Sequence, residues 1–165
     1  EWYSLLEFQT NSVTETQKIG EKLGQLLKPG NVVRLEGDLG AGKTTIAQGI
    51  CRGLGVKEPV TSPTFAIMHQ YNGKYPIYHI DAYRIESETE LQDLGLEEFL
   101  EGEGISLVEW AEKIMPVLPT TYLLIEIRTI AANEQGRMIT FQAVGNKQVY
   151  DSLLKEMAEQ CEFLV

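Results

Sequence analysis

The segment from Gly37 to Thr45, GDLGAGKTT, carries the best-defined chemistry in the chain. Gly37 to Thr44 match the pattern G-x-x-x-x-G-K-[ST] and stand between an expected strand and an expected helix, as a phosphate-binding loop (P-loop) requires. Glycines let successive backbone N–H groups turn towards an anion at the positive end of the following helix. The segment therefore predicts a site for the phosphates of a nucleoside triphosphate.

All nine residues of the loop are candidates for nucleotide binding, namely Gly37, Asp38, Leu39, Gly40, Ala41, Gly42, Lys43, Thr44 and Thr45. Lys43 supplies a mobile positive charge for the β and γ phosphates and is a candidate catalytic residue. The Thr44 hydroxyl suits Mg²⁺, and Thr45 suits a further phosphate contact. The acidic side chain of Asp38 should face away from the anion.

Two carboxylates stand where strands are expected to end. Asp81 closes PIYHID and Glu109 closes ISLVE, so both should emerge at the carboxyl edge of the sheet, where α/β proteins bind ligands. An enzyme with this loop needs an acid near Thr44 to hold Mg²⁺ directly or through water. One of the two carboxylates could hold the metal, and the other could position the attacking water.

Several neighbours of these acids have two interpretations. His79 shares a strand face with Asp81, and we interpret it as a structural hydrogen-bonding residue rather than a base. Trp110 either belongs to the core or lines the site, and Arg84 either contacts phosphate or pairs with an acid. The segment Thr61–Phe65, TSPTF, is either an ordinary turn or a nucleotide-sensing loop with hydroxyls for Mg²⁺ or the γ phosphate.

The first half of the chain alternates helical and strand patterns. Ser12 to Gly30 predicts a helix opened by a capping box, and Asn31 to Glu36 predicts the strand before the loop. A second helix should begin at Lys43. The runs TFAIMHQY and KYPIYHID flank Asn72-Gly73, which favours a type I′ hairpin placed beside the first strand.

The second half predicts two short helices, three strands and a final helix. Ser87 opens an acidic helix that Gly95 divides from a second one, and ISLVE follows as a strand. TYLLIEIR and RMITFQAV predict a hairpin at the sheet edge, with its turn around Asn133–Gly136. Val149 to Cys161 predicts an amphipathic helix that packs on the sheet.

These elements predict an α/β protein with the three-layer P-loop NTPase fold. Its mixed central sheet should contain an antiparallel hairpin and carry helices on both faces. The length of 165 residues and the hydrophobic content of 43% fit a single domain spanning residues 1–165.

Composition limits the functional classes. No run has the roughly 20 apolar residues of a membrane span, and the first ten residues lack a signal-peptide pattern, so we expect a cytoplasmic protein without membrane contact, monomeric when isolated. Cys51 and Cys161 form no CxxC pair and should be reduced thiols. A net charge of −10 argues against a chain that grips nucleic acid alone.

Two other nucleotide-binding classes fit less well. A guanine-specific GTPase would carry N-K-x-D, and the nearest match, Asn146 to Val149, lacks the acid. A small-molecule kinase would be expected to carry a lid with several arginines, whereas residues 86–109 are acidic and contain none. The kinase remains the alternative to an ATP hydrolase.

Five motifs together resemble the TsaE family. LEGDLGAGKTT, TSPTF, YHIDAYR, LGLEEF and LVEWAEKI occur in the family's order between about Thr10 and Gly145. The resemblance implies a bacterial ATPase of tRNA threonylcarbamoyladenosine (t6A) biosynthesis that binds the TsaB and TsaD heterodimer and resets it by hydrolysing ATP. The modified base is the adenosine next to the anticodon, and the tRNA would be held largely by the partners.

The resemblance also implies roles for matched residues. Thr44 and Glu109 become the magnesium ligands, and Asp81 becomes a catalytic acid of the nucleotide site that hydrolysis requires. Trp110 moves from the core to the neighbourhood of the nucleotide. ATP and Mg²⁺ are the expected ligands.

Overall fold

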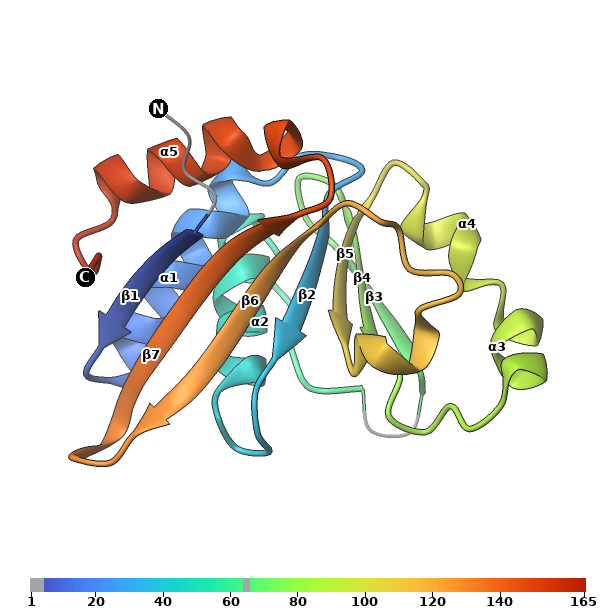
Figure 1. Cartoon of the computed structure of the whole chain (residues 1–165), viewed down its shortest axis with the longest axis horizontal. Coiled ribbons are helices and arrows are strands. Elements are labelled where there is room, and N and C mark those ends of the chain that lie inside the picture. The colour runs from blue at the N-terminus through green and yellow to red at the C-terminus, as the bar shows by residue number, and fades with distance from the viewer. Residues whose placement is uncertain (1–4, 64–65) are drawn as a thin grey trace.

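The computed structural model describes residues 5–63 and 66–165, which form a mixed β-sheet with helices on both faces (Figure 1). This arrangement confirms the expected three-layer α/β architecture. Two hydrophobic cores lie on opposite faces of the sheet, one under the helices next to the P-loop and one under the acidic helices.

In the described part of the chain, the sheet contains seven strands in the order β1-β7-β6-β2-β5-β4-β3. Their bounds are Leu5–Thr10 (β1), Val32–Glu36 (β2), Met68–Asn72 (β3), Pro76–Asp81 (β4), Ile105–Glu109 (β5), Tyr122–Ile130 (β6) and Asn133–Val144 (β7). The four central strands β4, β5, β2 and β6 are parallel, and the outer strands pair antiparallel. The carboxyl ends of the four central strands therefore meet at one edge.

The helices divide between the two faces (Figure 1). On one face lie α1 (Val13–Leu26), α2 (Lys43–Gly53) and α5 (Asp151–Gln160); on the other lie α3 (Glu88–Leu94), α4 (Leu96–Leu100) and the 3-10 helix η1 (Ala111–Ile114), while η2 (Lys147–Tyr150) leads into α5. Within the described residues, no helix combines the length and apolar character that a membrane span needs.

The buried strands follow from their sequences. β5 reads ISLVE and is buried at every position because helices cover both of its faces. In β2, Val33 and Leu35 join the core under α1 and α2, whereas Val32 joins the opposite core. The strand that delivers the P-loop is therefore anchored from both sides.

The N-terminal strand was missed from sequence, and the late hairpin was wrongly placed at the sheet edge. β1 alternates exposed and buried residues and pairs with β7, so it covers that hairpin. The β6–β7 turn lies at residues 131–132, earlier than predicted. The C-terminal tail continues the edge, with the Val165 amide donating to the Glu7 carbonyl (2.9 Å) and Phe8 bridging Leu164.

The β3–β4 hairpin also corrects two expectations. β5 lies between this hairpin and β2, so the hairpin is not beside the first strand. Asn72 pairs with Pro76, which leaves a turn of three residues, and Gly73 has no positive φ; the type I′ assignment was therefore wrong. β3 begins at Met68, and residues 64 and 65 of the predicted strand lie outside the described residues.

The helix limits were predicted with small errors. Ser12 caps α1 by accepting the Glu15 amide (3.1 Å), and the helix ends at Leu26 rather than Gly30 because Leu27 is already extended. Gly95 separates α3 from α4 as predicted, and α5 packs Leu154 into the core.

Neither cysteine is in a disulfide. Cys51 is fully buried in α2, and burial raises the pKa of its thiol to about 12. Cys161 is partly exposed, and desolvation by burial raises its pKa too. Both thiols stay protonated at neutral pH, as expected for structural cysteines.

Two helix backbones approach very closely where α1 crosses α2. The contact is made by Gly20 and Gly24 on α1 and by Gly49 and Gly53 on α2. A Cβ atom on Gly49 would lie 2.3 Å from the carbonyl oxygen of Gln17. Because α2 begins at the P-loop, this crossing fixes the position of the P-loop relative to the sheet.

Gly49→Ala should destabilise the protein, although alanine normally favours a helix by about 1 kcal/mol over glycine. The new methyl group would push backbone against backbone, and overpacking of this kind costs about 2 kcal/mol or more. Urea unfolding monitored by circular dichroism checks this expectation. Lys18→Ala, at an exposed position of α1, is the control and should change the free energy of unfolding by less than about 0.5 kcal/mol. A Gly49→Ala protein as stable as the parent would contradict the packing argument.

Candidate functional site

The predicted site residues meet at the carboxyl edge of the parallel strands. β4 and β5 are neighbours, and Asp81 and Glu109 are direct partners in their register. β2 lies on the other side of β5 and leads into the P-loop at the same edge. The topology thus brings together the two carboxylates and the loop, as the sequence predicted.

The P-loop has the backbone of an anion site. Gly40 and Gly42 have φ values of 80° and 115°, which residues with a side chain rarely adopt. Among the described residues, no side chain caps the N-terminus of α2 and no acid lies in its first turn, in contrast to the Ser12 cap of α1. The first amides of α2 are therefore left for a negatively charged ligand.

The residues of the P-loop differ in exposure. Asp38 is exposed, as expected for an acid that faces solvent, and its carbonyl accepts the Ala41 amide (2.9 Å) to close the turn. Leu39 at the tip is 97% exposed. Thr44 and Thr45 are half-buried in the first turn of α2.

Lys43 connects the P-loop to the carboxylates. Its side chain is only 10% exposed, and Nζ lies 4.0 Å from Glu109 Oε1. The same ammonium lies over the Trp110 ring, 5.1 Å from the centroid. Lys43 is therefore a partner of the buried Glu109 and is held between this carboxylate and the Trp110 ring.

Glu109 is buried and is held by a second partner. Its Oε2 lies 2.7 Å from His79 Nε2, and His79 is fully buried. Because His79 is shielded from solvent and fixed to a carboxylate, the geometry agrees with the structural role predicted for it. Its Nδ1 atom has no hydrogen-bond partner among the described residues.

Asp81 is more accessible than Glu109. Its Oδ1 accepts the Tyr83 amide (3.0 Å), which fixes one carboxylate oxygen. Burial raises the pKa of Asp81, and the Glu109 charge acts in the same direction. The Tyr83 amide, His79 and Lys43 oppose this increase in pKa.

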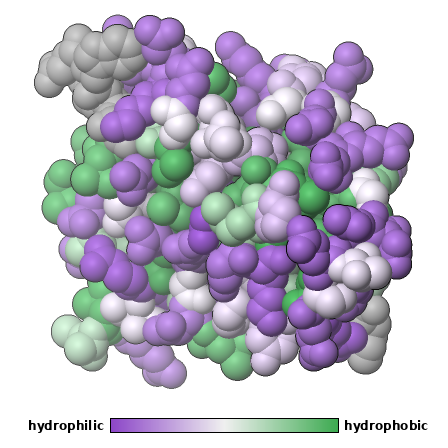
Figure 2. All heavy atoms as spheres, turned by 45° about the vertical axis from the view of Figure 1, so that its right-hand side comes forward, coloured by the Kyte–Doolittle hydropathy of each residue, from purple (hydrophilic) through white to green (hydrophobic). Residues whose placement is uncertain are grey.

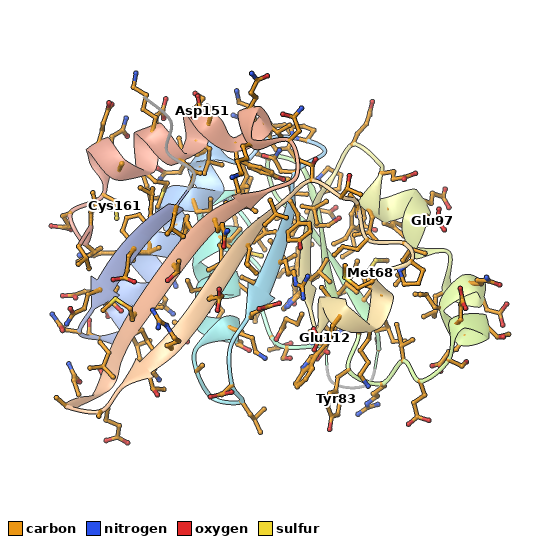
Figure 3. The ribbon with its side chains drawn as sticks, in the orientation of Figure 1. Met68, Tyr83, Glu97, Glu112, Asp151 and Cys161 are labelled. Carbon is orange, nitrogen blue, oxygen red and sulfur yellow. The ribbon has the colours of Figure 1, made fainter. Side chains whose placement is uncertain are left out.

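Trp110 has a strained backbone. Its φ of 58° is the only positive value among the described residues other than glycine, and such strain occurs preferentially at functional sites. The indole contacts the Tyr83 ring, with centroids 5.0 Å apart. Lys113 donates to the Tyr83 carbonyl (3.1 Å) and so fastens this aromatic pair. Figure 3 shows Tyr83 near Glu112 of η1, at the end where β4 and β5 finish.

The oxygen atoms at this edge suit Mg²⁺. Residues 5–63 and 66–165 contain no group of three or more His, Cys, Asp or Glu side chains that could hold a metal by themselves. Mg²⁺ usually takes one or two carboxylates together with substrate phosphates and water. The Thr44 hydroxyl on α2 and the Glu109 carboxylate on β5 fit that mode of binding.

A groove of about 490 Å³ runs beside the P-loop. Its lining includes Asp38, Lys43 and Trp110 on the loop side, and Glu36, Glu112 and Glu126 farther along. Arg34 balances these acids, with a 2.6 Å ion pair to Glu36 and a 3.1 Å hydrogen bond to the Tyr122 hydroxyl. The groove is thus a charged cleft open to solvent.

The segment Thr61–Phe65 is only partly described. Thr61 is held by the Tyr71 hydroxyl through both its amide and its carbonyl, each at 3.2 Å. Thr64 and Phe65 lie outside the described residues, so the nucleotide-sensing role stays a prediction. Arg84 is exposed beyond β4, and its proposed phosphate contact also stays a prediction.

Sequence reasoning missed Arg137. Its guanidinium reaches from β7 to the P-loop carbonyls of Ala41 and Gly40. An arginine 96 positions away from its contact belongs to no local motif, so a single sequence contains no signal for this role.

His79→Ala should destabilise the protein because the mutation leaves the buried Glu109 carboxylate with one partner fewer. A lost hydrogen bond to a buried charged group costs about 2 kcal/mol. Ser106→Ala on β5 is the matched control, since its buried hydroxyl has no partner among the described residues and its loss should be nearly neutral. Urea unfolding of both variants checks the prediction, and equal small effects would contradict the pairing.

Comparisons with known proteins agree with this geometry. The family model described as "Threonylcarbamoyl adenosine biosynthesis protein TsaE" matches residues 10–139. The tRNA threonylcarbamoyladenosine biosynthesis protein TsaE of Bacillus subtilis is 47% identical over 154 residues, which cover 93% of this chain and 94% of the relative. The protein of the same name from Treponema pallidum is 38% identical, covering 74% of this chain and 90% of that one.

A solved structure has the same fold. The crystal structure of Bacillus subtilis YdiB superposes with a TM-score of 0.77 at 39% sequence identity, and the match covers 94% of this chain and 95% of the other. The family match, the relatives and the fold together place the chain in the TsaE family of threonylcarbamoyladenosine biosynthesis proteins.

Proposed function

We propose that this chain is a Mg²⁺-dependent ATPase that binds the TsaB and TsaD complex. ATP hydrolysis then supports t6A formation at the adenosine next to the anticodon. The observation that carries the hydrolytic part is the buried Glu109 carboxylate beside Lys43, at the edge where the P-loop presents its amides. Membership of the TsaE family supplies the t6A context.

Each residue of the site has a task in this proposal. Thr44 and Glu109 would hold Mg²⁺, which when bound neutralises charge on the β and γ phosphates. Lys43 leaves Glu109 for the phosphates, since the incoming anion offers it a stronger partner. Asp81 orients the attacking water, because its second oxygen is not used by the Tyr83 amide. His79 holds Glu109 in place.

The acidic helices support hydrolysis over phosphoryl transfer to a metabolite. A kinase lid closes over the P-loop and carries cations that move with it. Here α3 and α4 instead bury Leu91, Leu96 and Leu100 in the core against the sheet. Helices packed into the core in this way do not fit a lid that moves over the P-loop.

The rim of the site favours a protein partner. Leu39 and Tyr83 are 97% and 58% exposed beside the P-loop and Trp110, and Met115 beyond η1 is 51% exposed. Exposed apolar side chains around a polar site are typical of surfaces that another protein covers. Docking of the TsaB and TsaD complex on this rim would also exclude water from the nucleotide.

The charge distribution favours an indirect contact with tRNA. Exposed acids follow one another on the segment around α3 and α4, among them Glu88, Asp93, Glu97 and Glu98. Figure 2 brings this side of the molecule forward and shows that hydrophilic residues dominate it. Phosphates would be repelled there, so the tRNA would be bound by the partners.

Steady-state ATP hydrolysis by the purified chain, with and without the TsaB and TsaD pair, tests the proposal. We expect slow Mg²⁺-dependent hydrolysis that the pair accelerates. Asp81→Asn should reduce turnover at least about a hundredfold, a typical contribution of a positioned acid or base, while ATP affinity changes little. Asp93→Asn, an exposed acid on α3, is the matched control and should leave turnover unchanged.

Two results would count against the proposal. ATP binding without any complex between this chain and the TsaB and TsaD pair would remove the partner role. Phosphate transfer from ATP to a metabolite, with no need for the pair, would establish the kinase alternative.

A further inference from the structure

We propose that Arg137 is a positioning residue of the nucleotide site. From β7, its guanidinium sets the orientation of the Ala41–Gly42 peptide in the P-loop. This inference rests on the proposed function only in requiring that the P-loop binds a nucleotide. It adds a residue from the β6–β7 hairpin to a site otherwise built from β2, α2, β4 and β5.

The guanidinium of Arg137 is shared between two backbone segments. Towards the P-loop, Nε donates to the Ala41 carbonyl (2.5 Å), and Nη2 approaches the Gly40 carbonyl (3.5 Å). Towards its own hairpin, Nη1 donates to the carbonyls of Glu134 (2.8 Å) and Gly136 (2.7 Å). The planar fork of arginine suits such a bridge between carbonyl groups.

The contact with Ala41 determines where the next amide points. In a trans peptide the C=O and the following N–H point in opposite directions, and no cis peptide occurs in the described residues. Since the Ala41 carbonyl faces Arg137, the Gly42 amide faces away from it. That amide belongs to the residue that precedes α2, where a phosphate-binding nest needs its donors.

The neighbouring peptide is fixed differently. The Ala41 amide donates to the Asp38 carbonyl inside the P-loop (2.9 Å), so the Gly40–Ala41 peptide is held by the P-loop itself. Within residues 5–63 and 66–165, no comparable backbone bond holds the Ala41–Gly42 peptide. Gly42 also has a φ of 115°, and a glycine without other restraints can rotate out of this conformation. Arg137 therefore restrains the Ala41–Gly42 peptide through its carbonyl.

Arg137 has a rigid base from which to act. It pairs with Thr10 of β1 and with Thr129 of β6, so its backbone lies inside the sheet. Two of its donors bind the hairpin end, which keeps the guanidinium in place before a nucleotide arrives. Preorganisation of this kind lowers the cost of binding, because the P-loop need not be ordered by the ligand.

Titration of the full-length protein with a fluorescent ATP analogue and Mg²⁺ tests the assignment, using Arg137→Lys and Arg137→Gln. Both variants should bind about tenfold more weakly, equivalent to about 1.4 kcal/mol, because neither side chain can bridge the two segments. Lys155→Gln on α5 is the charge-matched control, because Lys155 is exposed and does not line the groove beside the P-loop. Thermal unfolding without nucleotide verifies that each variant is folded.

A second measurement reports on the peptide itself. In ¹H–¹⁵N spectra, Mg-ATP should shift the Gly42 amide strongly in the parent protein, as expected for a new hydrogen bond to phosphate. In folded Arg137→Lys protein at nucleotide saturation, that shift should be clearly smaller. A purely structural role of Arg137 would lower thermal stability but leave this saturated shift unchanged.

The possible failures are distinguishable. If the parent protein binds no ATP, the proposed function fails. If the parent binds ATP and both Arg137 variants bind it as tightly as the parent does, the positioning role alone is overturned. If Lys155→Gln weakens binding as much as Arg137→Gln, or if Arg137→Lys retains full affinity, the effect is one of net charge and the positioning role is likewise overturned.

Discussion

The burial of one carboxylate constrains the rest of the site. Glu109 is 4% exposed at the end of a strand covered on both faces, and a charge removed from water must be paired or hydrogen-bonded. Lys43 and His79 provide these partners from α2 and β4. The position of the P-loop lysine and the packing of a neighbouring strand therefore both depend on Glu109.

The sheet topology makes this pairing possible. Parallel strands end at the same edge, so an acid at the end of β5, an acid at the end of β4 and a loop after β2 must converge. The close crossing of α1 and α2 then sets the distance of α2 from the sheet, and so the position from which Lys43 extends towards Glu109. The packing of these helices, away from the site, therefore helps to determine the distance between Lys43 and Glu109. Arg137 adds a restraint from the antiparallel half of the sheet, so both halves contribute to one site.

The parts of the site that the sequence predicted are local ones. The P-loop pattern, the carboxylates at strand ends and the division of α3 from α4 at Gly95 each follow from a few consecutive residues. The order of the strands does not, because β1 and β7 pair across more than 120 positions and β5 inserts between β2 and β4. Arg137 was missed for the same reason, since its partners become neighbours only after the sheet has formed. Thr61–Phe65 resembles a family motif, and within it Thr61 contacts the Tyr71 hydroxyl.

In the proposed mechanism, Lys43 exchanges Glu109 and the Trp110 face for the phosphates when Mg-ATP binds. Trp110 reports this exchange directly, because the Lys43 ammonium lies 5.1 Å from its ring centroid. The only other tryptophan, Trp2, can be replaced by phenylalanine so that all indole emission comes from Trp110. Emission is then recorded at nucleotide saturation, with saturation established independently by calorimetry. We predict a saturable change in emission in Trp2→Phe protein and little or none when Lys43→Ala is added. Unchanged emission from a protein fully loaded with Mg-ATP would show that Lys43 stays beside Glu109 and Trp110, and would contradict the proposed exchange.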